Sequence, residues 1–318
     1  MRAAPEDANC VVVSGLSRRD ALLALGAAAA GTVLGRRASA ASPAPLRRAI
    51  PSSGERIPAV GLGTWQTFDV GSSAAERAPL QQVLARFAEL GGRVVDTSPM
   101  YGRSEEVVGD LAANLGLTES LFLATKIWTR GREAGTGQME ASERLLRKKR
   151  LDLIQVHNLL DAGTHLATLR EWKARGRIRY VGVTHYTASA HGDLARLLRK
   201  EPLDFVQVNY SPVEREAEAT ILPLARERGV AVLANRPFGG GEALRRLAGR
   251  PLPAWAPEAD CASWAQIFLK WILANPAITC VIPATSKVRH LEENLTAGEG
   301  ALPDEALRSR MAAAVAPN

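Results

Sequence analysis

Arg93-Val94-Val95-Asp96-Thr97-Ser98 is a short apolar run that ends in polar side chains, and runs of this kind recur along the chain. Lys126 ends the next run 30 residues after Asp96, and His157 ends the following one 31 residues later. A unit of about thirty residues is what a parallel strand and its crossover helix require. Because the runs are apolar throughout, they are typical of parallel strands covered on both faces. The repeat predicts an α/β protein.

Eight such strands are expected, and a helical pattern follows each of the first seven. The strands cover residues 59–63, 93–98, 121–128, 151–158, 180–186, 204–211, 230–237 and 278–285, and the helical patterns cover residues 79–90, 105–115, 138–148, 166–175, 194–200, 217–228 and 262–274. Eight such units predict a closed (β/α)8 TIM barrel, and residues 46–50 and 57–64 predict a β-hairpin before it. An open doubly wound sheet is the alternative, but the G-x-G-x-x-G fingerprint of that fold does not appear after any of the predicted strands. The glycines 239–241 follow the seventh strand and open a loop instead.

The first forty residues have the pattern of an export signal. Arg18 and Arg19 precede an apolar run of fourteen residues, 21–34, and Ala38-Ser39-Ala40 provides the small residues of a cleavage site. This run is shorter than the roughly twenty residues that span a bilayer. The arginine pair indicates the twin-arginine route. Residues 1–40 are therefore expected to be the signal and 41–318 the barrel, with the export translocon as a partner and the periplasm as destination. An uncleaved tail on a cytoplasmic enzyme is the alternative.

Charge and cysteine content argue against several other classes of protein. The formal net charge is +7, but the basic residues are scattered, and only residues 147–150 form a dense run. No zinc-finger or RNA-binding pattern accompanies that run, so nucleic acid is not an expected partner. No later apolar run resembles a membrane span. Beside Cys10, the cysteines Cys261 and Cys280 are too few for a disulfide framework and lack metal-ligand spacing, so no metal site is expected and their pairing is left open.

Polar groups gather where three consecutive strands end, at the edge that carries the chemistry in such barrels. These groups are Asp96, Tyr101 in the loop behind it, Lys126 and His157. Singly they have ordinary explanations, such as a helix cap or a core histidine. Together they form a proton-transfer device, because a phenol with a pKa near 10 needs a neighbouring cation to act as an acid at neutral pH. Lys126 is expected to lower the pKa of Tyr101, Asp96 to hold the ammonium, and His157 to orient a carbonyl oxygen.

Four motifs at these positions resemble the aldo-keto reductases. They are Gly61-Leu62-Gly63-Thr64-Trp65, Val95-Asp96-Thr97-Ser98-Pro99-Met100-Tyr101-Gly102, Thr125-Lys126 and Asp152-Leu153-Ile154-Gln155-Val156-His157. They occur in the family's order and spacing, and the resemblance runs from about Leu46 to Leu295. It implies hydride transfer between a nicotinamide cofactor and a small-molecule aldehyde or ketone. It also implies that Tyr101 is the general acid, that Lys126 and Asp96 tune it, and that His157 positions the substrate.

The cofactor positions agree with the family less completely. Thr184 and Gln207 match residues that hold the nicotinamide amide, but His185 stands where Asn is usual, and Asn235 where many members have a Tyr that stacks on the ring. The other cofactor positions implied by the resemblance are Arg236, Phe238, Gly239, Thr285, Ser286, Lys287, Arg289, His290 and Asn294. His290 replaces the Arg with which many members grip a 2′-phosphate, but Lys287 and Arg289 lie close by. NADP is therefore expected, with NAD as the alternative.

Trp65 and Trp128 are expected at the mouth of the site, where tryptophans of relatives favour apolar or aromatic carbonyls; packing within the rim is the alternative. The individual substrate is not indicated. A metal-dependent barrel hydrolase would need paired His and carboxylate ligands at several strand ends. Only His157 and His185 lie at strand ends, and no H-x-H occurs. A non-catalytic cofactor-binding subunit is the other rival, and the complete set of four catalytic residues argues against it.

Overall fold

The computed structural model describes residues 45–316. The expected export signal at residues 1–40 lies outside this range. The described chain forms a barrel of eight parallel strands: β3 (Leu62–Gly63), β4 (Val94–Asp96), β5 (Phe122–Ile127), β6 (Leu151–His157), β7 (Ile178–His185), β8 (Phe205–Asn209), β9 (Ala231–Asn235) and β10 (Ile278–Val281). Neighbours in the sheet follow chain order from β3 to β10. Parallel bridges from Val60 to Val281 and from Gly63 to Ala284 join the two ends of the sheet, which confirms the predicted TIM barrel.

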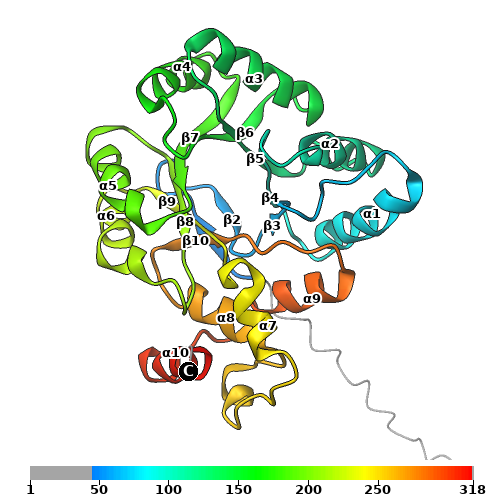
Figure 1. The fold of residues 1–318 in the computed structure, drawn as a ribbon, viewed down its shortest axis with the longest axis vertical. Helices are drawn as coiled ribbons and strands as arrows, with labels where there is room; N and C mark the ends of the chain where they lie inside the picture. Colours follow the sequence, from blue (N-terminus) through cyan, green and yellow to red (C-terminus); the bar gives the residue numbers. More distant parts are fainter. Residues whose placement is uncertain (1–44, 317–318) are drawn as a thin grey trace, which may run out of the picture. The chain divides into compact units, whose positions relative to one another are not determined.

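Helices surround the barrel, as Figure 1 shows. They are α1 (Ala74–Glu89), α2 (Ser104–Asn114), α3 (Arg132–Leu145), α4 (Ala162–Ala174), α5 (His191–Lys200), α6 (Ile221–Glu227), α7 (Glu242–Leu247), α8 (Trp264–Leu273), α9 (Val288–Thr296) and α10 (Glu305–Val315). Three of them, α7, α9 and α10, lie outside the seven helical patterns given above. The glycines 239–241 form a short 3-10 turn that leads directly into α7, and α10 packs against α8.

Several helices begin earlier than the apolar pattern predicted, and α1 shows the reason. The predicted helix began at Pro79, yet α1 begins at Ala74. The Ser73 side chain accepts a hydrogen bond from the backbone N–H of Glu76 and donates one to its carboxylate, which forms a capping box. Pro79 lies inside the helix on its exposed face, where the cost of one missing backbone hydrogen bond is offset by packing of the opposite face.

The predicted hairpin is also confirmed: β1 (Arg47–Ala49) and β2 (Arg56–Pro58) pair in antiparallel fashion. The hairpin closes the end of the barrel at which the strands begin. There Ile50 and Ile57 join an apolar cluster inside the barrel that includes Phe122, Tyr180 and Phe205. Glu55 of the hairpin also forms an ion pair with Arg179 of β7. Apolar side chains therefore fill this end of the barrel.

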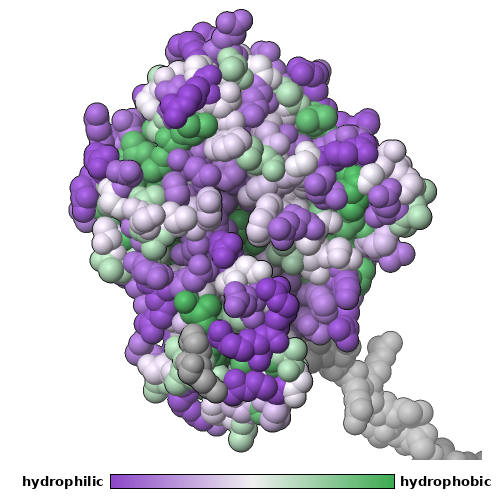
Figure 2. Space-filling view, in the orientation of Figure 1, coloured by the Kyte–Doolittle hydropathy of each residue, from purple (hydrophilic) through white to green (hydrophobic). Residues whose placement is uncertain are grey.

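The opposite end, where the strands finish, is lined by polar side chains. Asp96, Lys126, Gln155 and Gln207 all lie buried there. Helix α7, which follows β9, lies on this side, and Figure 2 shows the same face hollowed at its centre. The division of the barrel into an apolar closed end and a polar open end places the candidate site at the open end.

Candidate active site

Three neighbouring strands bring the predicted proton-transfer residues together. Asp96 is the last residue of β4, Lys126 lies in β5 one residue before its end, and His157 is the last residue of β6. Since β4, β5 and β6 pair side by side in parallel, their final side chains meet at one rim. Tyr101 lies in the connection between β4 and α2, where a turn from Ser98 to Tyr101 directs the chain back over the rim.

Lys126 forms a buried ion pair with Asp96. Its side chain is 1% exposed, and Nζ lies 2.7 Å from Asp96 Oδ2 and 2.7 Å from the backbone oxygen of Thr97, to which it donates. Burial alone would lower the pKa of the Lys126 ammonium, but the attraction of Asp96 and Tyr101 outweighs burial and raises it. The lysine therefore carries a fixed positive charge beside Tyr101.

Tyr101 lies between this cation and His157. Nζ of Lys126 is 4.8 Å from the centre of the phenol ring, and the ring stands nearly perpendicular to the imidazole of His157, with centroids 6.3 Å apart. The pKa of Tyr101 is nevertheless raised, because burial outweighs the lowering effect of Lys126. The expectation of a lowered phenol pKa is thus wrong for this structure, although the lysine acts in the expected direction.

His157 is held neutral. Burial, followed by the charge of Lys126, lowers the pKa of its imidazole to about 3. Nδ1 lies 3.5 Å from the hydroxyl of Ser98. A neutral imidazole at the rim can hydrogen-bond to a carbonyl oxygen without repelling the neighbouring lysine.

An amide network connects Asp96 with the next strands. Gln207 of β8 donates from Nε2 to Asp96 Oδ1 at 2.8 Å, and its own Oε1 accepts from Thr184 at 3.4 Å and from Asn235 at 3.3 Å. Gln155 of β6 also donates to Asp96 Oδ1 at 3.4 Å. Gln155 was not predicted as a site residue, although its position two residues before His157 indicates that both side chains face the barrel interior.

His185 ends β7 with a defined ring orientation. Its Nδ1 accepts from the backbone N–H of Thr187 at 3.2 Å, which leaves Nε2 for another partner. The ring stacks on Tyr186, with centroids 5.7 Å apart. Tyr186 is half exposed and was also not predicted; its position directly after a strand end is the signal that could have identified it.

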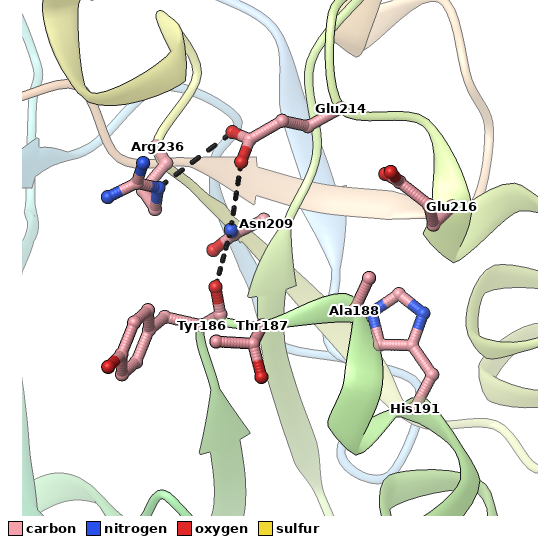
Figure 3. A pocket seen from close by; sticks show the side chains of 8 residues that line it. All are labelled: Tyr186, Thr187, Ala188, His191, Asn209, Glu214, Glu216 and Arg236. Atoms are coloured by element: carbon pink, nitrogen blue, oxygen red, sulfur yellow. Dashed lines mark hydrogen bonds and ion pairs between the residues drawn. The ribbon is translucent and has the colours of Figure 1, made fainter.

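A pocket of about 310 Å³ opens beside these residues, at the ends of β7, β8 and β9. Figure 3 shows Arg236 directed toward Glu214, whose carboxylate lies 3.8 Å from the guanidinium. Asn209 lies between them and the backbone of Tyr186, and donates to the Tyr186 oxygen at 2.6 Å. The buried atoms Oδ1 of Asn209 and Oδ1 of Asn235 have no hydrogen-bond partner among residues 45–316. Unsatisfied buried acceptors at strand ends are typical of a site that binds a polar ligand.

The predicted residues after β9 differ in where they point. Arg236 has a left-handed backbone with φ of 49° and faces the pocket, whereas the Phe238 ring packs on Phe268 of α8 with centroids 6.0 Å apart. The side chain of Phe238 therefore contributes to packing. Gly239 has φ of 56°, a conformation that favours glycine.

The segment after β10 places basic side chains at the surface. Thr285 is buried, and its hydroxyl accepts from the backbone N–H of Lys287, the residue that caps α9. Ser286, Lys287 and Arg289 are exposed, and Arg289 forms a hydrogen bond with His290 at 3.1 Å and lies 3.9 Å from Glu293, both on its own helix. Asn294 lies buried in the second turn of α9. These residues form a patch separate from the proton-transfer group.

Large apolar side chains stand exposed around the rim. Trp65 is 44% exposed and lies two residues after the end of β3. Trp128 is 37% exposed and directly follows β5. Met100, in the loop after β4, and Tyr186, directly after β7, are also exposed. The structure therefore leaves both tryptophans available at the rim rather than packed beneath it.

The described residues hold neither a metal site nor a membrane helix. Within residues 45–316 no cluster of three or more His, Cys, Asp or Glu side chains is placed to hold a metal ion. In the same part of the chain, no helix has the length and apolar character needed to cross a membrane. Cys261 and Cys280 are both buried, and within the part of the chain that the structure describes they are not bonded to each other.

The chain matches a known family over most of its length. The model of the aldo/keto reductase family matches residues 59–313. Methylglyoxal reductase YeaE of Escherichia coli is 30% identical over 245 residues, which cover 75% of this chain and 84% of that protein. Aldo-keto reductase yakc [NADP(+)] of Schizosaccharomyces pombe is 26% identical over 301 residues, with 80% and 87% covered.

Solved structures agree with these sequence matches. The aldo/keto reductase of Klebsiella pneumoniae, solved in complex with NADP and acetate, superposes with a TM-score of 0.70 at 25% identity, and the match covers 83% of this chain and 94% of that one. Because the family model spans most of the chain and the geometry of the rim fits the family's motifs, the chain belongs to the aldo/keto reductase family.

Proposed function

We propose that this protein is an NADP-dependent reductase that converts an aldehyde or ketone to the alcohol. The observation that carries the proposal is the group of side chains at the ends of β4, β5 and β6, in which the buried Lys126 lies between Asp96 and Tyr101 and a neutral His157 faces the phenol. The Schizosaccharomyces pombe relative named for NADP(+) and the Klebsiella pneumoniae structure solved with NADP support the cofactor.

Each residue of this group then has a defined task. The cofactor, when bound, supplies the hydride that the carbonyl carbon receives. Tyr101 gives its Oη proton to the carbonyl oxygen as negative charge develops there, and Lys126 stabilises the phenolate that remains. Asp96 keeps Lys126 charged and in place, and His157 orients the carbonyl by a hydrogen bond. A phenol whose pKa is raised by burial keeps its proton until the substrate oxygen becomes basic, so proton transfer is confined to the reaction itself.

The rim residues fit a nicotinamide cofactor. Gln207 and Thr184, together with the unsatisfied Oδ1 of Asn235, offer donors and acceptors for a carboxamide. His185 offers its free Nε2 in place of the usual Asn. At the far end, the exposed Lys287 and Arg289 offer positive charge to a 2′-phosphate, with the buried Asn294 and Thr285 beneath them. Arg236 and the backbone of Gly239 lie between these two groups along the chain.

The test measures oxidation of NADPH with a reactive aldehyde for the wild type and for Tyr101→Phe. The variant keeps the ring and loses the proton, so turnover is expected to fall at least about 10²-fold. The dissociation constant for NADPH, measured by fluorescence, should stay within a few-fold of wild type. Retained turnover in Tyr101→Phe would refute the phenol as the acid, and cofactor binding without turnover of any carbonyl would favour a non-catalytic subunit.

We also propose that residues 1–40 direct export through the twin-arginine translocon to the periplasm. The support is the order of Arg18-Arg19, the apolar run 21–34 and Ala38-Ser39-Ala40. Arg18→Lys combined with Arg19→Lys should retain the protein in the cytoplasm, full length and active, while the wild type should appear beyond the inner membrane and begin near Ala41. Cell fractionation with N-terminal sequencing distinguishes the two, and a full-length wild type found only in the cytosol would end the export proposal.

A further inference from the structure

The loop that carries Trp128 is held at its first residue by α3, the helix that follows the loop. Trp128 directly follows β5, and residues 128–131, here named the tryptophan loop, connect β5 with α3. The backbone N–H of Trp128 donates to Oε1 of Gln138 at 2.6 Å, and its carbonyl accepts from Nε2 of Gln138 at 3.4 Å. One side chain of α3 thus satisfies both backbone groups of Trp128 while the indole remains exposed.

The next residue of the loop is held by a buried histidine on another helix. His165 of α4 is fully buried, and its Nε2 lies 2.7 Å from the backbone oxygen of Thr129. A carbonyl oxygen only accepts, so Nε2 carries the hydrogen, and Nδ1 has no partner within the described part of the chain. The imidazole packs tightly against Gly135 of α3, where an added Cβ would lie 2.6 Å from its Cε1. The ring therefore has little room to turn away.

A third bond joins the tryptophan loop to the loop that follows His157. Asp161 accepts from the backbone N–H of Gly131 at 2.8 Å. Asp161, Asn158 and Leu159 all have left-handed backbones, with φ of 50°, 52° and 55°. Such conformations are unfavourable for residues other than glycine and persist where the surroundings hold them. The loop after His157 and the tryptophan loop therefore support each other.

We propose that His165 is a positioning residue that, through Thr129, sets Trp128 as a rigid wall of the substrate mouth and thereby gives the enzyme selectivity for flat aromatic carbonyls. The proposal rests on the proposed function. A fixed indole can stack on an aromatic substrate with little loss of conformational entropy, because its side chain and loop are already ordered. A mobile loop would have to be ordered each time a substrate binds, and this would weaken binding. The selectivity then appears in KM for aromatic substrates, because the wall contacts the substrate body and not the reacting atoms.

The first test compares benzaldehyde with propanal in five variants. His165→Leu removes the bond to Thr129 and should raise KM for benzaldehyde about two- to tenfold, the range that loss of one aromatic packing contact produces, with kcat and the KM for propanal nearly unchanged. His165→Gln, which keeps an N–H within reach of Thr129, should keep the KM for benzaldehyde close to the wild-type value. Thr168→Val is the matched control, since it removes a partly buried hydrogen bond of the same helix, from the Thr168 hydroxyl to the Thr164 oxygen, that does not touch the loop. In a Trp128→Ala background, His165→Leu should have no further effect.

The second test does not depend on activity. Arg130 lies exposed inside the tryptophan loop, so trypsin reports on its mobility. Cleavage after Arg130 should be slow in the full-length wild type, in His165→Gln and in Thr168→Val, and several-fold faster in His165→Leu. If His165→Leu does not fold, Gln138→Leu, at a half-buried position that holds the same loop, should give the same increase.

The outcomes separate this inference from the proposed function. A wild type that reduces no carbonyl would refute the function, and the proteolysis result would still decide whether His165 holds the loop. If His165→Leu changes neither cleavage at Arg130 nor the preference for benzaldehyde more than Thr168→Val does, the inference is overturned. It is also overturned if the loss of preference persists unchanged when Trp128 is already Ala.

Discussion

Replacement of Lys126 by Met separates the contribution of the buried ion pair to stability from its contribution to catalysis. The methionine fills a similar volume but leaves the Asp96 carboxylate, which is nearly fully buried, without its cation. Removal of one partner of a buried pair typically costs about 3–5 kcal/mol of unfolding free energy. Two hydrogen bonds from the amides of Gln207 and Gln155 remain on Asp96, so we expect the lower end of this range, about 3 kcal/mol.

The double variant Lys126→Met with Asp96→Asn is the matched control. It removes the uncompensated charge and keeps an oxygen for Gln207, so most of the lost stability should return. Urea unfolding at neutral pH measures both variants, and the slope with denaturant should stay constant. Carbonyl reduction should fall at least about 10²-fold in both, because neither has a cation beside Tyr101. A single variant within about 1 kcal/mol of wild type, or a double variant as unstable as the single one, would refute the charged pair described above.

Two further predictions concern cofactor selection and acid stability. If Lys287 and Arg289 bind a 2′-phosphate, their joint replacement by Ala should raise the Michaelis constant for NADPH about tenfold or more per lost contact. The Michaelis constant for NADH should stay nearly unchanged. Equal effects on both cofactors in steady-state kinetics would mean that other residues set the preference for NADPH. His157 has a folded pKa of about 3, below its ordinary value of 6.5. Because the unfolded chain therefore binds this proton more readily, the unfolding free energy should fall as pH drops from 6.5 toward 3, by at most about 1.4 kcal/mol per pH unit. His157→Gln should lose less stability than the wild type between pH 7 and pH 5 in urea unfolding, and an identical loss would contradict a buried neutral imidazole.

The sequence was sufficient to predict the barrel and the proximity of Asp96, Lys126 and His157. Parallel strands of similar spacing end at one rim, so residues at equivalent ends must meet whatever the details of packing. The helix starts were predicted less well, because the apolar periodicity that defines a buried face fades in the first exposed turn. The capping box from Ser73 to Glu76 was a local signal that the apolar pattern alone did not include.

Other features of the site depend on distances that a sequence does not contain. The direction of the Tyr101 pKa shift is set by the balance of burial and the Lys126 charge, and residue types alone do not give that balance. His165 is an isolated histidine just before the predicted helical pattern 166–175, and its bond to Thr129, 36 residues earlier, follows only from the packing of α4 on α3. Phe238 lies among predicted cofactor residues, but the position of Phe268 turns its ring inward.

The hairpin of β1 and β2 has a practical consequence for the way the protein can be attached to a surface. It closes the barrel end opposite Asp96 and Tyr101, and the described chain enters the fold there, just before Arg47. A resin, electrode or fusion partner linked ahead of Arg47 would therefore hold each molecule by its sealed base. The rim with Trp65 and Trp128 would face the bulk solution, so an immobilised layer should retain substrate access that random coupling through surface lysines would partly block.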